Sequence, residues 1–488
     1  MTELKFVDTT LRDGPQSLWS LRMRTAMMLP VAPILDEAGF ESIEIMASPE
    51  FKKCVRDLKE DPWERLRAVK QAIRKTPLRF IRGRYNNAFQ IESDALVDLW
   101  TERLAAYGID ELRVSDSSNT AEGWQKQVAF AHRHGMNIIL NLIYSLSPKH
   151  TDEYYAEKTR QAAALRPKAL CIKDPGALIT PERVRTLVPV VLANAGDIPV
   201  EFHTHCSTGL GAISTLEAIK LGITCVNTAI PPLAEGSSNP STFNITANAR
   251  ALGYGPKIDE ASLHEVERHF TAIAEAEDLP IGRPMAYDYS QYQHQVPGGM
   301  ISNFRFQLGK VGMEDRLPQA LEETARVRAE LGYPIMVTPY SQFVGTQAAL
   351  NVITGGRYRT ITDEVIHYAL GWWGEEERSS IDPNVRDVIL SSPRAKELAK
   401  TQPEQLSAKE LRQRYGGPGV SDDELLLRIA ADKESVDAMR RARAVSGQNG
   451  ADPLISLIDR LGAFGPGMHL SIRTAGLSLT IGRSGAAG

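Results

Sequence analysis

Eight apolar runs alternate with amphipathic segments in the first half of the chain, and this alternation constrains the fold more than any other feature of the sequence. Each run is short, is bounded by turn-forming residues and is typical of a buried strand, whereas the segments between the runs have helical spacing. Strand–helix units repeated at intervals of roughly 30 residues predict a closed parallel (β/α)8 TIM barrel. A doubly wound open sheet is the alternative, although no GxGxxG motif follows the first run. The eight expected strands are Lys5–Asp8, Ser42–Met46, Leu78–Arg82, Glu111–Ser115, Asn137–Tyr144, Ala169–Lys173, Val200–His203 and Thr224–Ala229.

Helical segments dominate the second half of the chain and predict a mostly α-helical second domain. A polar linker is expected at Ala444–Asp452 and a short β-hairpin within His469–Ile481. The expected domains are therefore residues 1–300 (barrel), 301–443 (helical domain) and 444–488 (linker and small C-terminal segment). Two of the expected helices are Arg24–Ala38, in the barrel, and Ser421–Met439, in the helical domain.

The composition excludes several function classes. The 488 residues are 42% hydrophobic and 24% charged, with a net charge of -4, so nothing indicates a nucleic-acid or anionic-membrane partner. The four cysteines are scattered and indicate reduced thiols in a cytoplasmic protein. The N-terminus has no signal-peptide layout, and no apolar run is long enough to span a bilayer.

Polar residues end several of the expected strands, where barrel chemistry gathers. The run Ala169–Lys173 ends in a lysine, and a buried ammonium needs a partner or a changed protonation state. His203 and His205 end another run at i and i+2, a spacing that places both imidazoles on one side of a strand. Two imidazoles on one side can bind the same ion, so the sequence predicts a metal site at the barrel mouth.

Several motifs resemble those of the biotin-dependent carboxyltransferases, the family of pyruvate carboxylase, the oxaloacetate decarboxylase α subunit and transcarboxylase. The opening motif Asp8–Ser17 (DTTLRDGPQS) carries the resemblance first, and Arg82-Gly83, Cys171–Asp174 and His203–His205 follow in order. The resemblance extends to about Arg441. It implies a metal-containing barrel followed by a helical carboxylase domain.

The resemblance also implies a site. The metal ligands would be Asp8, His203, His205 and a carbamylated Lys173, around zinc, manganese or cobalt. Carbamylation would turn a buried cation into an anionic oxygen ligand. The implied reaction moves a carboxyl group between carboxybiotin and an enolisable carbonyl acceptor, such as a keto acid, through a metal-stabilised enolate. The residues implied in substrate binding or catalysis are Arg82 and Gln16, which would hold the substrate, and Ser237, which would shuttle a proton.

The sequence departs from the family pattern around the mouth. Pro15 replaces a histidine, Cys206 replaces an aspartate, and Arg84 adds a second cation that would hold another anionic group of the substrate. No biotinyl segment is found, so biotin is expected on a partner, a separate biotin carboxyl carrier protein, with a separate biotin carboxylase. The resemblance further implies a homo-oligomer, a dimer or larger.

Three other functions remain open from the sequence. A metal-dependent carbon–carbon lyase or condensing enzyme of the hydroxymethylglutaryl-CoA lyase type has the same barrel and histidine pair, but generally lacks the carbamylated lysine and the helical domain. A biotin-independent enzyme on the same scaffold is a second alternative, which the altered mouth favours. A scaffold subunit without activity is the third, and the retained residues Asp8, Lys173, His203 and His205 argue against it.

Overall fold

The computed structural model describes residues 2–87, 90–287, 289, 292, 308–309, 312–417, 419–448, 469–474 and 477–482. The chain divides into two compact units, Met1–Val436 and Asp437–Gly488. The predicted domain boundary at residue 300 lies outside the described residues and stays a prediction.

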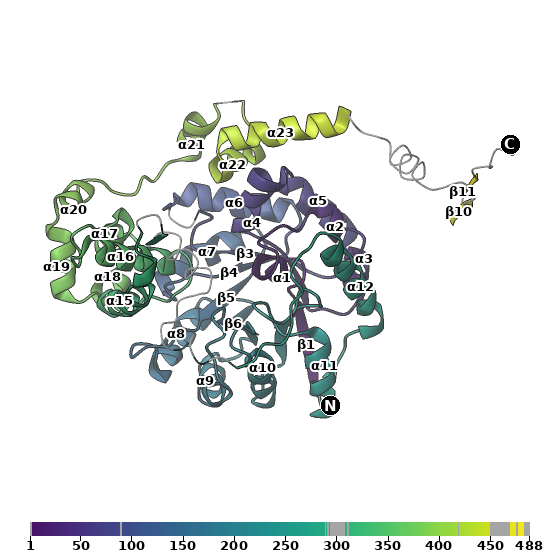
Figure 1. Ribbon diagram of the computed structural model, residues 1–488, viewed down its shortest axis with the longest axis horizontal. Helices are drawn as coiled ribbons and strands as arrows, with labels where there is room; N and C mark the ends of the chain where they lie inside the picture. The colour runs from purple at the N-terminus through teal and green to yellow at the C-terminus, as the bar shows by residue number, and fades with distance from the viewer. Residues whose placement is uncertain are drawn as a thin grey trace. The chain divides into compact units, whose positions relative to one another are not determined.

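Eight parallel strands form a closed barrel in the first unit (Figure 1). Consecutive strands from β2 to β8 pair in chain order, and β1 pairs with both β8 and β2, which closes the ring. A two-residue strand, β9 (Gly255–Pro256), adds to the start of β1. All eight strand predictions and the barrel are confirmed, because the apolar runs are buried between the barrel interior and the helices. The strands are β1 (Glu3–Asp8), β2 (Ser42–Ala47), β3 (Leu78–Arg82), β4 (Glu111–Val114), β5 (Asn137–Ile143), β6 (Ala169–Asp174), β7 (Val200–Thr204) and β8 (Cys225–Thr228).

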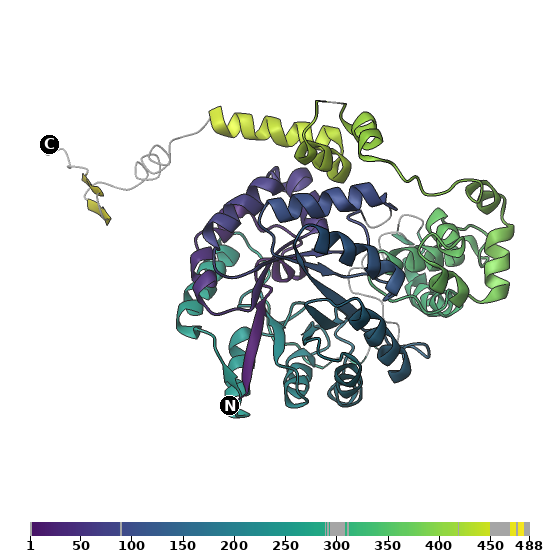
Figure 2. The same cartoon turned by 180° about the vertical axis from the view of Figure 1, so that it is seen from behind.

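Helices surround the strands on the outside of the barrel (Figures 1 and 2). Several of them begin at a side-chain cap, such as Thr120, Thr151 and Thr180, whose hydroxyl accepts from a backbone N–H of the first turn. Helix α1 (Asp13–Ser17) lies at the carboxyl ends of the strands instead. The helices of the outer layer are α2 (Thr25–Met28), α3 (Ala32–Glu37), α4 (Ser48–Lys53), the π-helix η1 (Cys54–Leu58), α5 (Pro62–Ala72), α6 (Asp94–Ala106), α7 (Ala121–Arg133), α8 (Asp152–Ala164), α9 (Pro181–Asn194), α10 (Gly211–Lys220), α11 (Thr242–Ala251) and α12 (Glu260–Ala276).

A second group of helices has its own apolar core, which includes Phe343, Tyr368 and Trp373. It contacts the loops that follow neighbouring barrel strands: Arg84, after β3, donates to the Trp373 carbonyl oxygen at 2.5 Å, and Arg328 donates to the Ser145 hydroxyl, after β5, at 2.9 Å. The group therefore lies against the carboxyl ends of β3–β5. Its elements are the 3-10 helix η2 (Glu314–Arg316), α15 (Leu317–Glu330), α16 (Tyr340–Thr354), α17 (Asp363–Ala369), α18 (Glu375–Ser380), α19 (Pro383–Ser391) and α20 (Pro393–Leu398).

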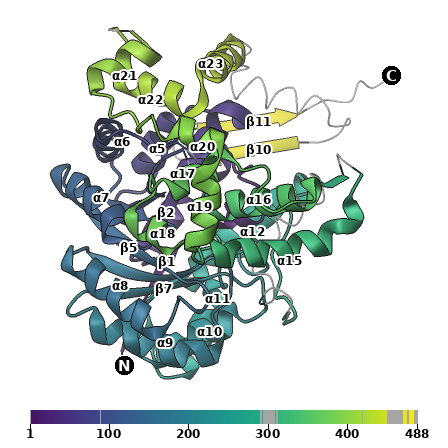
Figure 3. The ribbon, with the colours of Figure 1, turned by 90° about the vertical axis from the view of Figure 1, so that its left-hand side faces the viewer.

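The remaining helices are α21 (Ala408–Tyr415), α22 (Asp422–Ala431) and α23 (Lys433–Gln448). Helix α22 packs on the outside of the barrel, where Asp423 accepts from Arg103 of α6 at 2.7 Å. In the second unit, β10 (His469–Thr474) and β11 (Leu477–Gly482) pair antiparallel, which confirms the predicted hairpin (Figure 3). Within the described residues, no helix has both the length and the apolar character needed to cross a bilayer.

Three predictions of local structure are wrong. The expected helix Arg24–Ala38 is two short helices, α2 and α3, separated around Pro30, which cannot donate a helical hydrogen bond. The expected helix Ser421–Met439 is interrupted at Asp432, whose φ of 63° lies in the left-handed region. Helix α23 extends to Gln448, so the first residues of the expected linker Ala444–Asp452 are helical, and its last residues lie outside the described part of the chain.

Candidate metal centre

Three side chains converge at the carboxyl end of the barrel strands: Asp13, His203 and His205. His203 is on β7, His205 follows it, and Asp13 begins α1 directly above the end of β1. Asp13 Oδ2 lies 3.2 Å from His203 Nε2 and 3.5 Å from His205 Nε2. One ligand atom from each residue lies within 4.8 Å of the others, and all three residues are buried. This spacing and donor set are suited to a divalent cation.

Each imidazole is oriented by its other nitrogen. His205 Nδ1 donates to the carbonyl oxygen of Ser237 at 2.6 Å, which leaves Nε2 to face Asp13. His203 Nδ1 lies 2.9 Å from the amide oxygen of Asn227. Burial, with Lys173 nearby, holds the pKa of His203 well below its usual range, which keeps the ring neutral. Metal-binding histidines are commonly fixed in this way, with one nitrogen bound to the protein and the other facing the ion.

Lys173, the last residue but one of β6, is in register with His203 on β7 and is 6% exposed. Among the described residues, its ammonium forms no ion pair within 4.0 Å. Burial, with Arg113 and Arg12 nearby, lowers the pKa of Lys173 to about 7. A buried amine that is partly neutral at physiological pH is a nucleophile and suits the carbamylation that the sequence resemblance implies.

Asp8 does not belong to this cluster, although the sequence analysis expected it to be a ligand. Val7 pairs with Asn227, which lines the barrel interior, so the next residue on the strand faces outward toward the helices. There Asp8 Oδ1 accepts from the Thr10 hydroxyl at 2.5 Å, and Oδ2 has no hydrogen-bond partner among the described residues. Burial raises the pKa of Asp8 to about 7. Asp13, five residues later in the same motif, takes the place that we assigned to Asp8.

Arg82 also faces away from the mouth. Arg79 lies inside the barrel, and three residues along a strand bring a side chain to the opposite face. The Arg82 guanidinium contacts Thr101 of α6 and Gln127 of α7, and its Nε has no partner among the described residues. Burial lowers the pKa of Arg82 to about 10. These contacts anchor helices, and they do not bring Arg82 to the Asp13–His203–His205 cluster.

Arg84, expected to hold an anionic group, is engaged by the protein. It is paired with Asp116 at 2.9 Å and donates to the hydroxyls of Ser118 and Thr120 at 2.7 and 3.0 Å, in addition to the Trp373 carbonyl. Its guanidinium therefore joins two barrel loops to the helical group.

Gln16 and Ser237 lie beside the cluster and are exposed. Gln16 Oε1 is 3.4 Å from the guanidinium of Arg12, which itself pairs with Asp13 at 2.8 Å. The Ser237 hydroxyl donates to the carbonyl oxygen of Ser17 at 2.8 Å. Both residues are accessible at the mouth, as a substrate-contacting role requires.

Charged residues below the cluster were missed by the sequence analysis. Glu44 of β2 accepts from Arg12 at 2.5 Å and from Arg113 of β4 at 2.5 Å. Burial alone would raise the pKa of Glu44, but the two guanidinium groups outweigh it and hold the pKa below its usual range. Arg12 and Asp13 stand inside the opening motif, so that motif held the missing signal. Glu44 and Arg113 are polar residues within apolar runs and gave a weaker one.

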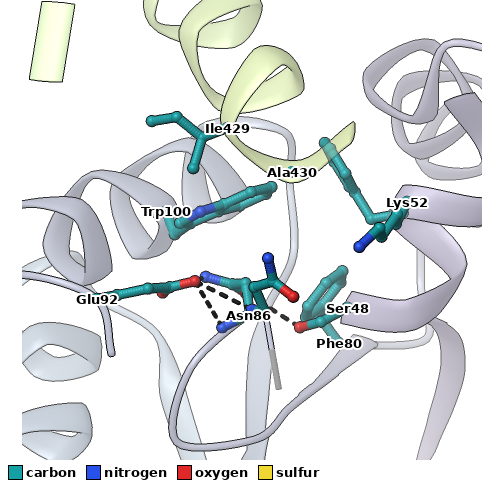
Figure 4. Close-up of a pocket in the computed structure, with 10 residues that line it drawn as sticks. Ser48, Lys52, Phe80, Asn86, Glu92, Trp100, Ile429 and Ala430 are labelled. Carbon is teal, nitrogen blue, oxygen red and sulfur yellow. Dashed lines mark hydrogen bonds between the residues drawn. The ribbon is translucent and has the colours of Figure 1, made fainter. Parts of the chain in front are cut away.

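A separate cavity of about 20 Å³ lies outside the barrel, between α4, α6 and α22 (Figure 4). Lys52, Glu92 and Trp100 surround it, and Asn86 donates to Glu92 at 3.1 Å. This volume holds about one water molecule, so the cavity is too small for a keto acid.

Two family models match the chain. The HMGL-like model matches residues 3–269, which form the barrel, and the conserved carboxylase domain model matches residues 292–449. Both helical and barrel parts are thus covered, in the order that the carboxylase resemblance implied.

Three relatives match most of the chain. A pyruvate carboxylase subunit of Methanocaldococcus jannaschii is 38% identical over 79% of this chain and 68% of the relative. Methylmalonyl-CoA carboxyltransferase 5S subunit of Propionibacterium freudenreichii subsp. shermanii is 31% identical over 78% of this chain and 76% of the relative. The 2-oxoglutarate carboxylase large subunit of Hydrogenobacter thermophilus is 33% identical over 76% of this chain and 58% of the relative.

A solved structure shares this fold. The carboxyl transferase domain of Rhizobium etli pyruvate carboxylase, in a structure of its Y628A variant with pyruvate, superposes with a TM-score of 0.80 and 23% identity. The match covers 98% of this chain and 84% of that one. Barrel, helical domain and mouth cluster together define an enzyme of the carboxyltransferase class. The chain belongs to the carboxyltransferase family of the biotin-dependent carboxylases.

Proposed function

We propose that this chain is the carboxyltransferase component of a multi-subunit enzyme, in which a separate carrier protein brings carboxybiotin to the barrel mouth. The acceptor would be a small keto acid or a related carbonyl compound. The observation that carries the proposal is the cluster of Asp13, His203 and His205 next to Lys173, which has no ion-pair partner among the described residues. The relatives support it, since two are subunits named for keto acid carboxylation.

The cluster would hold a divalent cation, zinc, manganese or cobalt, through Asp13, His203, His205 and the carbamate of Lys173. Two imidazoles and two anionic oxygens are a donor set that these metals accept. When bound, the ion acts as a Lewis acid that stabilises negative charge on a carbonyl oxygen. Carbamylation of Lys173 would also remove a positive charge from a site that Arg12 and Arg113 already crowd.

The chain's own residues would handle the substrate and the proton. Gln16 would contact the keto acid by hydrogen bonding, and the Ser237 hydroxyl would carry the proton between biotin and the carbon acceptor. Arg82, which we expected to hold the carboxylate, contacts α6 and α7 instead. We therefore propose that Arg12, next to Gln16 and Asp13, contributes the positive charge near the substrate.

The lyase alternative draws on the HMGL-like match, which covers the barrel alone. A lyase of the hydroxymethylglutaryl-CoA type would not need Lys173 or a biotin carrier. The two functions therefore differ in their dependence on this lysine.

The test uses the full chain, purified with a divalent metal and mixed with a biotinylated carrier protein. We expect carboxyl exchange between oxaloacetate and biotin, and its loss in Lys173→Ala. A Lys173→Ala variant that retains both its metal and its turnover would contradict the proposal. Cleavage of a hydroxyacyl thioester without biotin would favour the lyase.

A further inference from the structure

A buried carboxyl group without a partner lies where the helical group meets the barrel. Glu377, on α18, is 4% exposed, and its Oε2 has no hydrogen-bond partner among the described residues. A Cβ added to Gly374 would lie 2.7 Å from this oxygen, so the backbone of Gly374 covers it closely. Glu377 also forms no ion pair within the described part of the chain. An ionised carboxylate here would lack the hydrogen bonds and the counter-charge that a buried charge requires.

The cation that most favours ionisation of Glu377 is already engaged. Arg84, after β3, is paired with Asp116 at 2.9 Å and also donates to the Trp373 carbonyl oxygen. Both oxygens of Asp116 have donors, because Arg84 donates to Oδ2 and the backbone N–H of Ser118 donates to Oδ1 at 3.1 Å. Of the two carboxyl groups beside Arg84, Asp116 is thus satisfied as an anion, and Glu377 is the one that carries a proton.

The lysines on the barrel side do not compensate Glu377 either. Lys158, on α8, pairs with the neighbouring Glu376 at 2.6 Å. Lys149, after β5, donates to the Ser380 hydroxyl at 3.1 Å, and burial lowers its pKa. Each cation at this contact therefore has a partner other than Glu377.

The surroundings of Glu377 favour its neutral form. Burial, with the like charges of Asp116 and Glu376, outweighs Arg84 and raises the pKa of Glu377 from its ordinary 4.5 to about 8. The titratable and charged groups around it are Arg84 after β3, Asp116 after β4, Glu122 of α7, Lys149 after β5, Tyr154 and Lys158 of α8, Tyr340 of α16, Tyr368 of α17 and Glu376 of α18.

We propose that Glu377 makes the attachment of the helical group to the barrel depend on pH. A neutral carboxyl group can remain buried, whereas an ionised one has to be hydrated, which separates α18 from the loops after β3–β5. In the separated state the group has its ordinary pKa of 4.5. The attachment is therefore strongest below about pH 5, weakens as the pH rises to about 8 and changes no further above that. This inference is independent of the proposed function.

Glu376 provides a matched control on the same helix. Its side chain is 40% exposed and is paired with Lys158, whereas Glu377 is buried and unpaired among the described residues. Glu376→Gln and Glu377→Gln each remove one carboxyl group from α18. Only Glu377→Gln replaces a buried group with one that stays neutral at every pH.

The experiment measures hydrogen exchange of the full chain by mass spectrometry at about pH 6 and about pH 8, with rates corrected for the pH dependence of intrinsic exchange. Peptides that span α18 report the attachment, and peptides that span α9, on the outside of the barrel, report unfolding of the barrel. The infrared difference spectrum between the parent chain and Glu377→Gln at the lower pH detects a neutral carboxylic acid at Glu377. Thermal unfolding shows that each variant is folded.

In the parent chain, protection of α18 should fall by about 10–50-fold between about pH 6 and about pH 8, while protection of α9 stays constant. Glu377→Gln should have the same protection of α18 at both pH values and should lose a carboxylic acid band. Glu376→Gln should have weaker protection at both pH values and retain the pH dependence. Equal pH dependence in Glu377→Gln and the parent chain, constant protection of α18 in the parent chain, or no carboxylic acid band in the difference spectrum would overturn the inference.

Discussion

The mouth and the base of the barrel are both lined with buried charged residues, but these are fully paired only at the base. At the base, Arg79 pairs with Glu111 at 2.8 Å and with Glu201 at 2.8 Å, and Lys168 also pairs with Glu111. At the mouth, Lys173 is unpaired among the described residues, and two imidazole nitrogens face one carboxylate. Glu201 and His203 are only two residues apart on β7. The comparison teaches that compensated charge holds the barrel closed, whereas incompletely satisfied charge marks the place for a ligand.

The largest expected effect breaks the base. Arg79→Met leaves Glu111 and Glu201 buried with one cation fewer, so the free energy of unfolding should fall by about 3–5 kcal/mol. Denaturant unfolding measures it. Arg79→Lys keeps the charge but loses the paired contacts to Glu201. Its free energy of unfolding should therefore lie between those of the parent chain and Arg79→Met. A loss below about 1 kcal/mol, as for an exposed ion pair, would contradict the assignment of the base to stability.

Two lysines in or next to β6, one at each end of the barrel, allow the roles of the two ends to be tested separately. Lys173→Ala should lower turnover by about 10²–10³-fold, because it removes a ligand of the proposed metal centre, with little change in the free energy of unfolding. Lys168→Ala, at the base, should do the reverse: it should destabilise the protein and leave turnover within a few-fold. Steady-state kinetics measures turnover, and denaturant unfolding measures stability. The opposite pattern would contradict the assignment of the mouth to catalysis and the base to stability.

Two aspartates of the opening motif sharpen the outline of the mouth. Asp13→Asn should lower Zn²⁺ affinity by at least about 10–100-fold, because it removes an anionic ligand. Asp8→Asn should leave the affinity unchanged, since Asp8 faces the helices and is held partly neutral by burial. Competition with a chelator measures both affinities. Equal losses would place Asp8 at the metal after all.

The smallest effect concerns pH at Lys173. The neutral amine is the form that reacts with CO₂, and burial lowers its pKa to about 7. Uptake of 13C-bicarbonate carbon by metal-free protein should therefore increase as the pH rises through about 7, well below the range of an exposed lysine. 13C NMR detects the carbamate, and Lys173→Arg is the control without a signal. Uptake that begins only near pH 10 would contradict the low pKa.

The strands and the histidine pair could be predicted because each depends on local pattern. Apolar runs and their spacing specify the barrel, and the i, i+2 spacing specifies that His203 and His205 share a side. The choice of Asp13 over Asp8 could not be made in this way. It depends on which face of β1 lines the interior, and that face is set by pairing between Val7 and Asn227, which are far apart in the sequence.

The predicted role of Arg82 could not be checked from the sequence for a related reason. The resemblance placed Arg82 at a strand end. The face of the strand on which Arg82 lies follows from its spacing of three residues from Arg79, which is inside the barrel. The sequence alone could not show that Arg79 is inside. Arg84 was expected to be free for substrate, but it is engaged by Asp116, Ser118 and Thr120 of a neighbouring loop and by the Trp373 carbonyl, nearly three hundred residues later. Local pattern predicts elements; the partners of a buried charge depend on tertiary pairing.

The closure of the barrel by β1 has a consequence for how the chain acquires its structure. The Thr9 hydroxyl donates to the Thr228 carbonyl oxygen, 219 residues further along the chain, and β1 also pairs with β8 through its backbone. During synthesis β1 therefore stays without its β8 partner until the eighth strand has been made. Contacts of such sequence separation slow folding and expose the nascent chain to aggregation, so β1 is among the last strands of the barrel to be secured.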